Sequence, residues 1–85
     1  MKAQAAAALT VARENFERRV RLGADDPFTR YYAACVYALR GETELALDSL
    51  ERAARERRPF TVERAKMEPD LSSLRAEPRF RNLLE

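Results

Sequence analysis

The side chain with the richest chemistry in this 85-residue chain is its single cysteine, Cys35. A cysteine nucleophile or redox thiol needs a base or another charged group beside it, and the chain contains no histidine. We therefore expect Cys35 to be a small buried apolar side chain in a reducing compartment. Because the chain has no second cysteine, no disulfide can form within it.

The carboxylates and serines fit structural roles better than catalysis or metal binding. Asp25 and Asp26 stand directly before Pro27, which is the pattern of a helix start and not of a calcium loop. Ser72-Ser73 has no partner base, and two glycines 18 positions apart cannot form a phosphate loop. The sequence thus predicts a protein that is not an enzyme, without catalytic residues, metal ligands or cofactors.

Basic residues gather in one part of the sequence. The cluster consists of Arg52, Arg55, Arg57 and Arg58, followed by Arg64 and Lys66. Nearby Asp48 and Glu51 favour solvated ion pairs, and a net charge of only +2 does not require an anionic partner. The cluster still leaves open an alternative function, in which this arginine-rich edge binds nucleic acid or an acidic protein.

Composition predicts an all-α domain. The chain has 46% hydrophobic and 35% charged residues, contains no isoleucine, and is rich in Ala, Leu, Arg and Glu. Strand formers are scarce, whereas these four residues favour helices. Helical periodicity and the turn residues predict helices over 3–22, 27–40 and 43–57, and then short helices over 61–68 and from Pro78 onward.

Each expected helix has one apolar face. For the first helix the face is Leu9, Ala12, Phe16 and Val20, extended by Ala5 and Ala8; for the third it is Leu45, Ala46, Leu50, Ala53 and Ala54. In the tail, Leu71, Leu74, Phe80, Leu83 and Leu84 are expected to point inward. Gly23 and Gly41 are placed to end the first and second helices in left-handed caps.

A spaced pattern of small and large apolar residues marks the middle of the chain. The pattern is Tyr37-x3-Gly41-x4-Ala46-x3-Leu50-x2-Ala53, and Ala34 precedes it. It is repeated faintly about 34 residues earlier, where Ala12 aligns with Ala46 and Phe16 with Leu50. On these residues the chain resembles the tetratricopeptide repeat family. Arg30 stands where a tryptophan is frequent in that family, and Arg19 replaces a small residue.

The resemblance implies an antiparallel helix-turn-helix repeat within one domain spanning residues 1–85. Residues 1–23 would be a half-repeat helix, 26–58 a full repeat, and 59–85 a tail of short capping helices. It also implies binding of a partner peptide or helix by the first helix of each repeat. Carried over to this chain, the partner-binding residues would be Phe28, Tyr31, Cys35 and Ala38.

Those four side chains are apolar or aromatic, so a partner carboxylate is not their natural ligand. An apolar peptide, an amphipathic helix or a second copy of the chain fits them better. The sequence leaves three uses of this face open: burial within the monomer, self-association, and a groove for a partner.

The expected function is a non-catalytic protein–protein interaction module that forms a homodimer, because repeat arrays usually need about three units for stability. We expect it in the cytoplasm and not in a membrane, because no run reaches the roughly 20 apolar residues of a membrane span.

Overall fold

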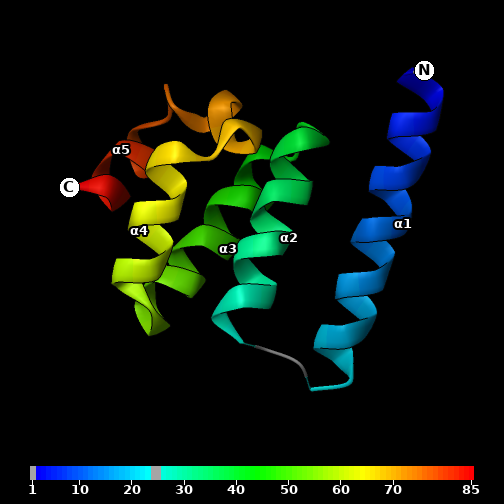
Figure 1. Cartoon of the computed structure of the whole chain (residues 1–85), viewed down its shortest axis with the longest axis horizontal. Helices are drawn as coiled ribbons and strands as arrows, with labels where there is room; N and C mark the ends of the chain where they lie inside the picture. The colour runs from blue at the N-terminus through cyan, green and yellow to red at the C-terminus, as the bar shows by residue number, and fades with distance from the viewer. Residues whose placement is uncertain (1, 24–25) are drawn as a thin grey trace.

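The computed structural model describes residues 2–23 and 26–85, with side chains from Ala8 onward, and over these residues it is helical without strands (Figure 1). The elements are α1 (Lys2–Arg21), α2 (Pro27–Leu39), α3 (Thr43–Glu56), α4 (Arg58–Met67), the 3₁₀ helix η1 (Pro69–Leu74) and α5 (Pro78–Leu84). The all-α prediction is confirmed. The bounds of α1, α2 and α3 each differ by at most one residue from those expected.

The turn chemistry read from the sequence sets these bounds. Asp26 caps α2, because its carboxylate accepts hydrogen bonds from the Thr29 backbone N–H (2.8 Å) and the Thr29 hydroxyl (2.9 Å). Gly23 and Gly41 have φ angles of 102° and 79°, the left-handed conformation in which a helix commonly ends. Asp25 lies outside the described residues.

Helix α2 occupies the middle of the fold, where it packs against α3, η1 and α1 (Figure 1). Its contact with α3 is close because Ala34 on α2 and Ala46 and Ala53 on α3 are small and have no exposed surface. Leu50 fills the space between the two alanines of α3 and is also fully buried. The small-and-large pattern of the sequence therefore produces a tightly packed helix hairpin.

Helix α1 is joined to α2 by both apolar and polar contacts. Phe16 is buried and packs edge-on against the ring of Tyr37 at 5.1 Å between centroids. The Tyr37 hydroxyl donates a hydrogen bond to Glu17 (2.8 Å), and the Arg40 guanidinium donates one to Thr10 (2.7 Å). These contacts fix the angle at which α1 stands beside α2.

The C-terminal segment closes the core. Leu71 and Leu74 of η1 and Phe80 of α5 are buried, as the sequence predicts. On α5, the Arg79 guanidinium donates hydrogen bonds to both carboxylate oxygens of Glu51 on α3 (3.1 and 2.7 Å). Those bonds hold the pKa of Glu51 below its usual value.

Three expectations are wrong in detail. Leu45 is 40% exposed, and Leu47, which the sequence analysis left off the inner face of α3, is 1% exposed.

Helix α4 begins at Arg58 and not at Thr61, because Pro59 fits the first turn of a helix where no N–H donor is needed. Thr61 is consequently buried inside α4, without a hydrogen-bond partner for its hydroxyl. Ala8 is exposed, and the Ala5 side chain lies outside the described ones.

Candidate functional site

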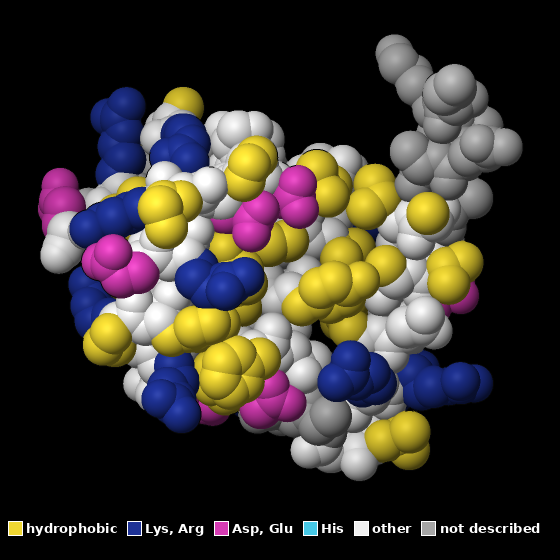
Figure 2. Space-filling model, in the orientation of Figure 1, with side chains coloured by type: hydrophobic (Ala, Val, Ile, Leu, Met, Phe, Trp, Pro, Cys, Tyr) yellow, Lys and Arg dark blue, Asp and Glu magenta, His cyan; other side chains and the backbone are white. Residues whose placement is uncertain are grey.

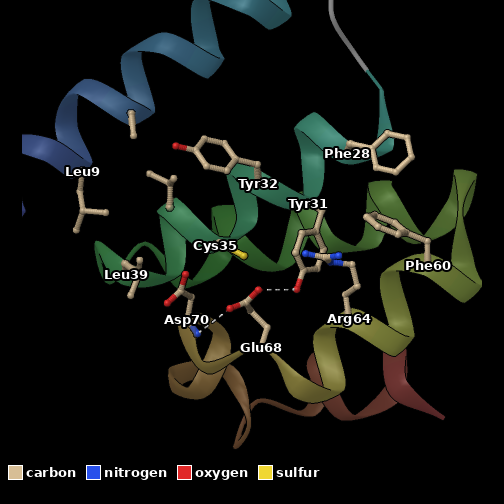
Figure 3. Close-up of a pocket in the computed structure, with 12 residues that line it drawn as sticks. Leu9, Phe28, Tyr31, Tyr32, Cys35, Leu39, Phe60, Arg64, Glu68 and Asp70 are labelled. Carbon is tan, nitrogen blue, oxygen red and sulfur yellow. Dashed lines mark hydrogen bonds between the residues drawn. The ribbon is translucent and has the colours of Figure 1, made fainter.

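A surface hollow of about 610 Å³ forms a groove that runs along α2. Tyr32, Cys35 and Leu39 of α2 form much of its floor, and Leu9 of α1 lies on one wall (Figure 3). Helix α4 and η1 form the other wall. We call this hollow the α2 groove. Figure 2 shows hydrophobic side chains gathered on this face between α1 and α4.

The structure places three of the four expected partner-binding residues in the α2 groove. Phe28 is 53% exposed at one end, whereas Tyr31 and Cys35 line the groove with only 6% and 7% of their surface exposed. Ala38 is buried and does not line the groove. The four therefore divide into one accessible ring, two floor residues and one core residue.

Two apolar groups of the α2 groove that are nearly as accessible as Phe28 were not selected by the sequence analysis. Tyr32 and Leu39 are about half-exposed and lie on the floor beside Cys35. Tyr32 and Leu39 are seven residues apart, so both lie on the same side of a helix with 3.6 residues per turn. This spacing could have identified them from the sequence. Phe60 comes from α4, and only the folded tail brings it to α2.

An aromatic cluster with two arginines forms one end of the α2 groove. The Phe60 ring packs edge-on against Phe28 and Tyr31, with centroids 4.7 and 5.7 Å apart. The Arg64 guanidinium lies 5.7 Å from the Tyr31 centroid and 5.5 Å from that of Phe60, and the Arg57 guanidinium lies 6.0 Å from the Phe28 centroid. This end is therefore aromatic and positively charged.

Two carboxylates continue the wall formed by α4 and η1 from the aromatic cluster toward the Leu39 end of the groove. Glu68 accepts a hydrogen bond from the Tyr31 hydroxyl (3.3 Å), and its second oxygen accepts one from the Asp70 backbone N–H (3.5 Å). Asp70 lies beside Leu39 (Figure 3). This end is therefore aliphatic and negatively charged.

The environment of Cys35 does not activate its thiol. Burial, with a smaller contribution from the nearby carboxylates of Glu68 and Asp70, raises the pKa of Cys35 to about 12. A thiol with such a pKa is almost entirely protonated at neutral pH and is a poor nucleophile. Cys35 thus contributes an apolar surface to the groove floor.

The arginine-rich edge expected from the sequence is divided among different contacts. Arg57 lies over Phe28, and Arg58 donates a hydrogen bond to the Leu83 carbonyl at the end of α5 (3.2 Å). Arg52 and Arg55 line a second hollow of about 320 Å³, on α2 and α3, together with Arg30. Asp48 and Glu51 line the same hollow, so its charge is mixed.

Two further properties concern only the described part of the chain. It contains no group of three or more acidic or cysteine side chains placed to hold a metal ion. No helix in it is both long and apolar enough to cross a membrane.

Comparisons with protein-family models, with curated proteins and with solved structures each found no match to this chain.

Proposed function

We propose that this protein is a non-catalytic protein–protein interaction module that binds an amphipathic helix of its partner in the α2 groove. The single observation that carries the proposal is a concave, mostly apolar hollow whose floor exposes about half of Tyr32 and of Leu39. Exposed apolar side chains gathered in a hollow commonly mark an interaction site. The tetratricopeptide-like arrangement is part of this proposal.

The dimensions of the groove favour a helix as its occupant. Phe28 and Leu39 are eleven residues apart on α2, which at 1.5 Å per residue is about 16 Å. A partner helix of about three turns would span that length. It would place apolar side chains from positions i, i+3, i+4 and i+7 against the floor.

A catalytic use of the α2 groove has less support. Its one potential nucleophile, Cys35, has a raised pKa, and the chain contains no histidine to serve as a base. The remaining polar groups, Arg64, Glu68 and Asp70, suit the recognition of a charged partner. We therefore keep the non-enzymatic interpretation.

The alternative function, binding of nucleic acid or an acidic partner, also has less support. Only Arg52 and Arg55 of the expected edge line a common hollow, and Asp48 and Glu51 line it too. A protein surface that binds nucleic acid usually carries an excess of positive charge along its length. Binding that falls steeply with salt concentration would favour this alternative.

A selection experiment tests the proposed function. A display library of helical peptides, with leucines fixed at helical spacing and other positions randomised, is selected against the protein. We expect bound peptides whose affinity falls about tenfold or more in Leu39→Asp, because this change removes an apolar contact from the groove floor. The matched control is Leu22→Asp, since Leu22 is 80% exposed and does not line the groove. Equal losses in both variants, or no selected peptide at all, would contradict the proposal.

The homodimer expected from the sequence stays a prediction, and the α2 groove is the surface that it would use. Light scattering over a dilution series measures the molar mass. A dimer that becomes a monomer in Leu39→Asp would mean that a second copy covers the groove. A wild-type monomer at tens of micromolar would contradict self-association.

A further inference from the structure

The two ends of the α2 groove carry opposite charges, and this arrangement bears on how a partner helix lies in it. Arg57 and Arg64 stand beside the aromatic cluster at the Phe28 end. Glu68 and Asp70 stand toward the Leu39 end (Figure 3). Among the described contacts, no salt bridge joins any two of these four side chains.

We propose, on the basis of the function proposed above, that the groove selects a partner helix with one basic and one acidic end and binds it in one direction. The basic end lies over Glu68 and Asp70, and the acidic end lies over Arg57 and Arg64. The apolar floor supplies affinity for any amphipathic helix, whereas the charges at the two ends choose among such helices.

The separation of the charges makes this selection physically reasonable. Arg57, over the Phe28 ring, and Asp70, beside Leu39, mark ends of the groove that are about 16 Å apart along α2, which is longer than the Debye length of roughly 8 Å at physiological ionic strength. Arg64 and Glu68 lie closer together, because Glu68 accepts a hydrogen bond from the tyrosine whose ring Arg64 covers. The outermost charges, Arg57 and Asp70, therefore act on different parts of the partner helix. A reversed helix would place like charges together at both ends and lose both favourable contacts.

Contacts within the fold hold the charges in place. The guanidinium of Arg64 lies within 6 Å of the centres of both the Tyr31 and Phe60 rings, which is the geometry of a cation–π contact. Glu68 is held by the Tyr31 hydroxyl and by the N–H of Asp70. A partner therefore meets charges whose positions are already set, which lowers the entropic cost of recognition.

A pair of model helices tests the inference. The first has about 14 residues, a leucine stripe, three glutamates at its N-terminal end and three lysines at its C-terminal end. The control peptide has the same composition, but its lysines and glutamates alternate. We expect the first peptide to bind the wild-type protein roughly threefold to tenfold more tightly, as two or three exposed ion pairs would give, and this advantage to vanish at about 1 M salt.

Direction is measured with a nitroxide on the lysine end of the first peptide and ¹⁵N-labelled protein. We expect stronger paramagnetic broadening of the amide signals of Leu39 and Asp70 than of those of Phe28 and Phe60. In the double variant Arg64→Glu/Asp70→Lys, the net charge is unchanged but each end becomes neutral. The variant is therefore expected to lose the preference and show equal broadening at the two ends.

The possible outcomes separate this inference from the proposed function. If both peptides bind the groove equally, or broadening is equally strong at both ends of the wild-type protein, the charge-selection inference is wrong and the groove function stands. If neither peptide binds, or if light scattering shows a dimer that covers the groove and excludes them, a partner helix is not the occupant. Both proposals then fail.

Discussion

Tyr31 and Glu68, 37 positions apart in the sequence, are joined by a hydrogen bond of 3.3 Å between the tyrosine hydroxyl and the carboxylate. The bond ties the floor of the α2 groove on α2 to the residue that precedes η1. It also fixes one of the two carboxylates at the negatively charged end of the groove. Structural stability and the charge pattern of the proposed site therefore depend on the same pair.

Tyr31→Phe tests this pair directly. The substitution removes the hydroxyl but keeps the buried ring, so we expect the free energy of unfolding to fall by about 0.5–1.5 kcal/mol. Urea denaturation measures it. The matched control is Tyr32→Phe, at a half-exposed position, which should change stability by less than about 0.5 kcal/mol. Equal effects of the two substitutions would show that the Tyr31–Glu68 bond contributes nothing.

Alkaline pH should destabilise the protein. Burial raises the pKa values of Cys35 and Tyr37 to about 12, and burial likewise raises that of Tyr31. In the unfolded chain these groups ionise near their ordinary values of about 8.5 for Cys and about 10 for Tyr. The folded state therefore holds more protons at high pH. Its full stability is present below about pH 8 and is lost as the pH rises toward 12.

The expected slope is about 1.4 kcal/mol per pH unit for each group that has ionised only in the unfolded chain. Denaturation curves between pH 7 and pH 10.5 would measure it. Cys35→Ala should remove the first part of the decline, between about pH 8.5 and 10. A free energy of unfolding that stays constant up to pH 10 would mean that the Cys35 thiol is not shielded from solvent.

Two leucines of α3 provide a matched test of the core. Leu47→Ala should lower the free energy of unfolding by about 2–5 kcal/mol, because Leu47 is 1% exposed and its truncation leaves a cavity. Leu45→Ala should cost less than about 1 kcal/mol, because Leu45 is 40% exposed. Thermal or urea unfolding distinguishes them. A larger loss of stability for Leu45→Ala than for Leu47→Ala would mean that Leu45 lies on the buried face of α3, as the sequence predicted.

The left-handed turn at Gly41 can be tested without disturbing any packing. A Cβ atom added at Gly41 would meet no other atom within 4 Å, so the cost of Gly41→Ala comes from its φ of 79° alone. We expect a loss of about 1 kcal/mol. Gly41→Asn should cost less, since asparagine tolerates this conformation better. If asparagine proved as costly as alanine, backbone strain would not be the reason.

Local signals in the sequence were sufficient to predict the helices and their ends. Asp26, Pro27 and Gly41 act through hydrogen bonds and backbone angles that involve only a few neighbouring residues. The close packing of α2 on α3 was also predictable, because Ala46 and Ala53 recur at helical spacing. These features depend little on the rest of the chain.

The composition of the α2 groove was not predictable in the same way. Phe60 and Glu68 reach α2 only because the tail folds back on it, and no short-range pattern encodes that contact. Leu45 and Leu47, by contrast, are two positions apart and lie on nearly opposite sides of α3, so the helical period could have identified Leu47, on the side of Leu50, as the buried one. The sequence selected Phe28, Tyr31 and Cys35, but it missed the opposite charges at the two ends.

The central claim is that the α2 groove is the binding surface, and amide chemical-shift mapping tests it most directly. A peptide selected from the helical library is titrated into ¹⁵N-labelled protein. The account predicts shifts concentrated at Tyr32, Cys35 and Leu39 of α2 and at Phe60 of α4. Shifts concentrated instead at Ser49, Arg52 and Arg55 would contradict it, because binding would then use the hollow on α2 and α3.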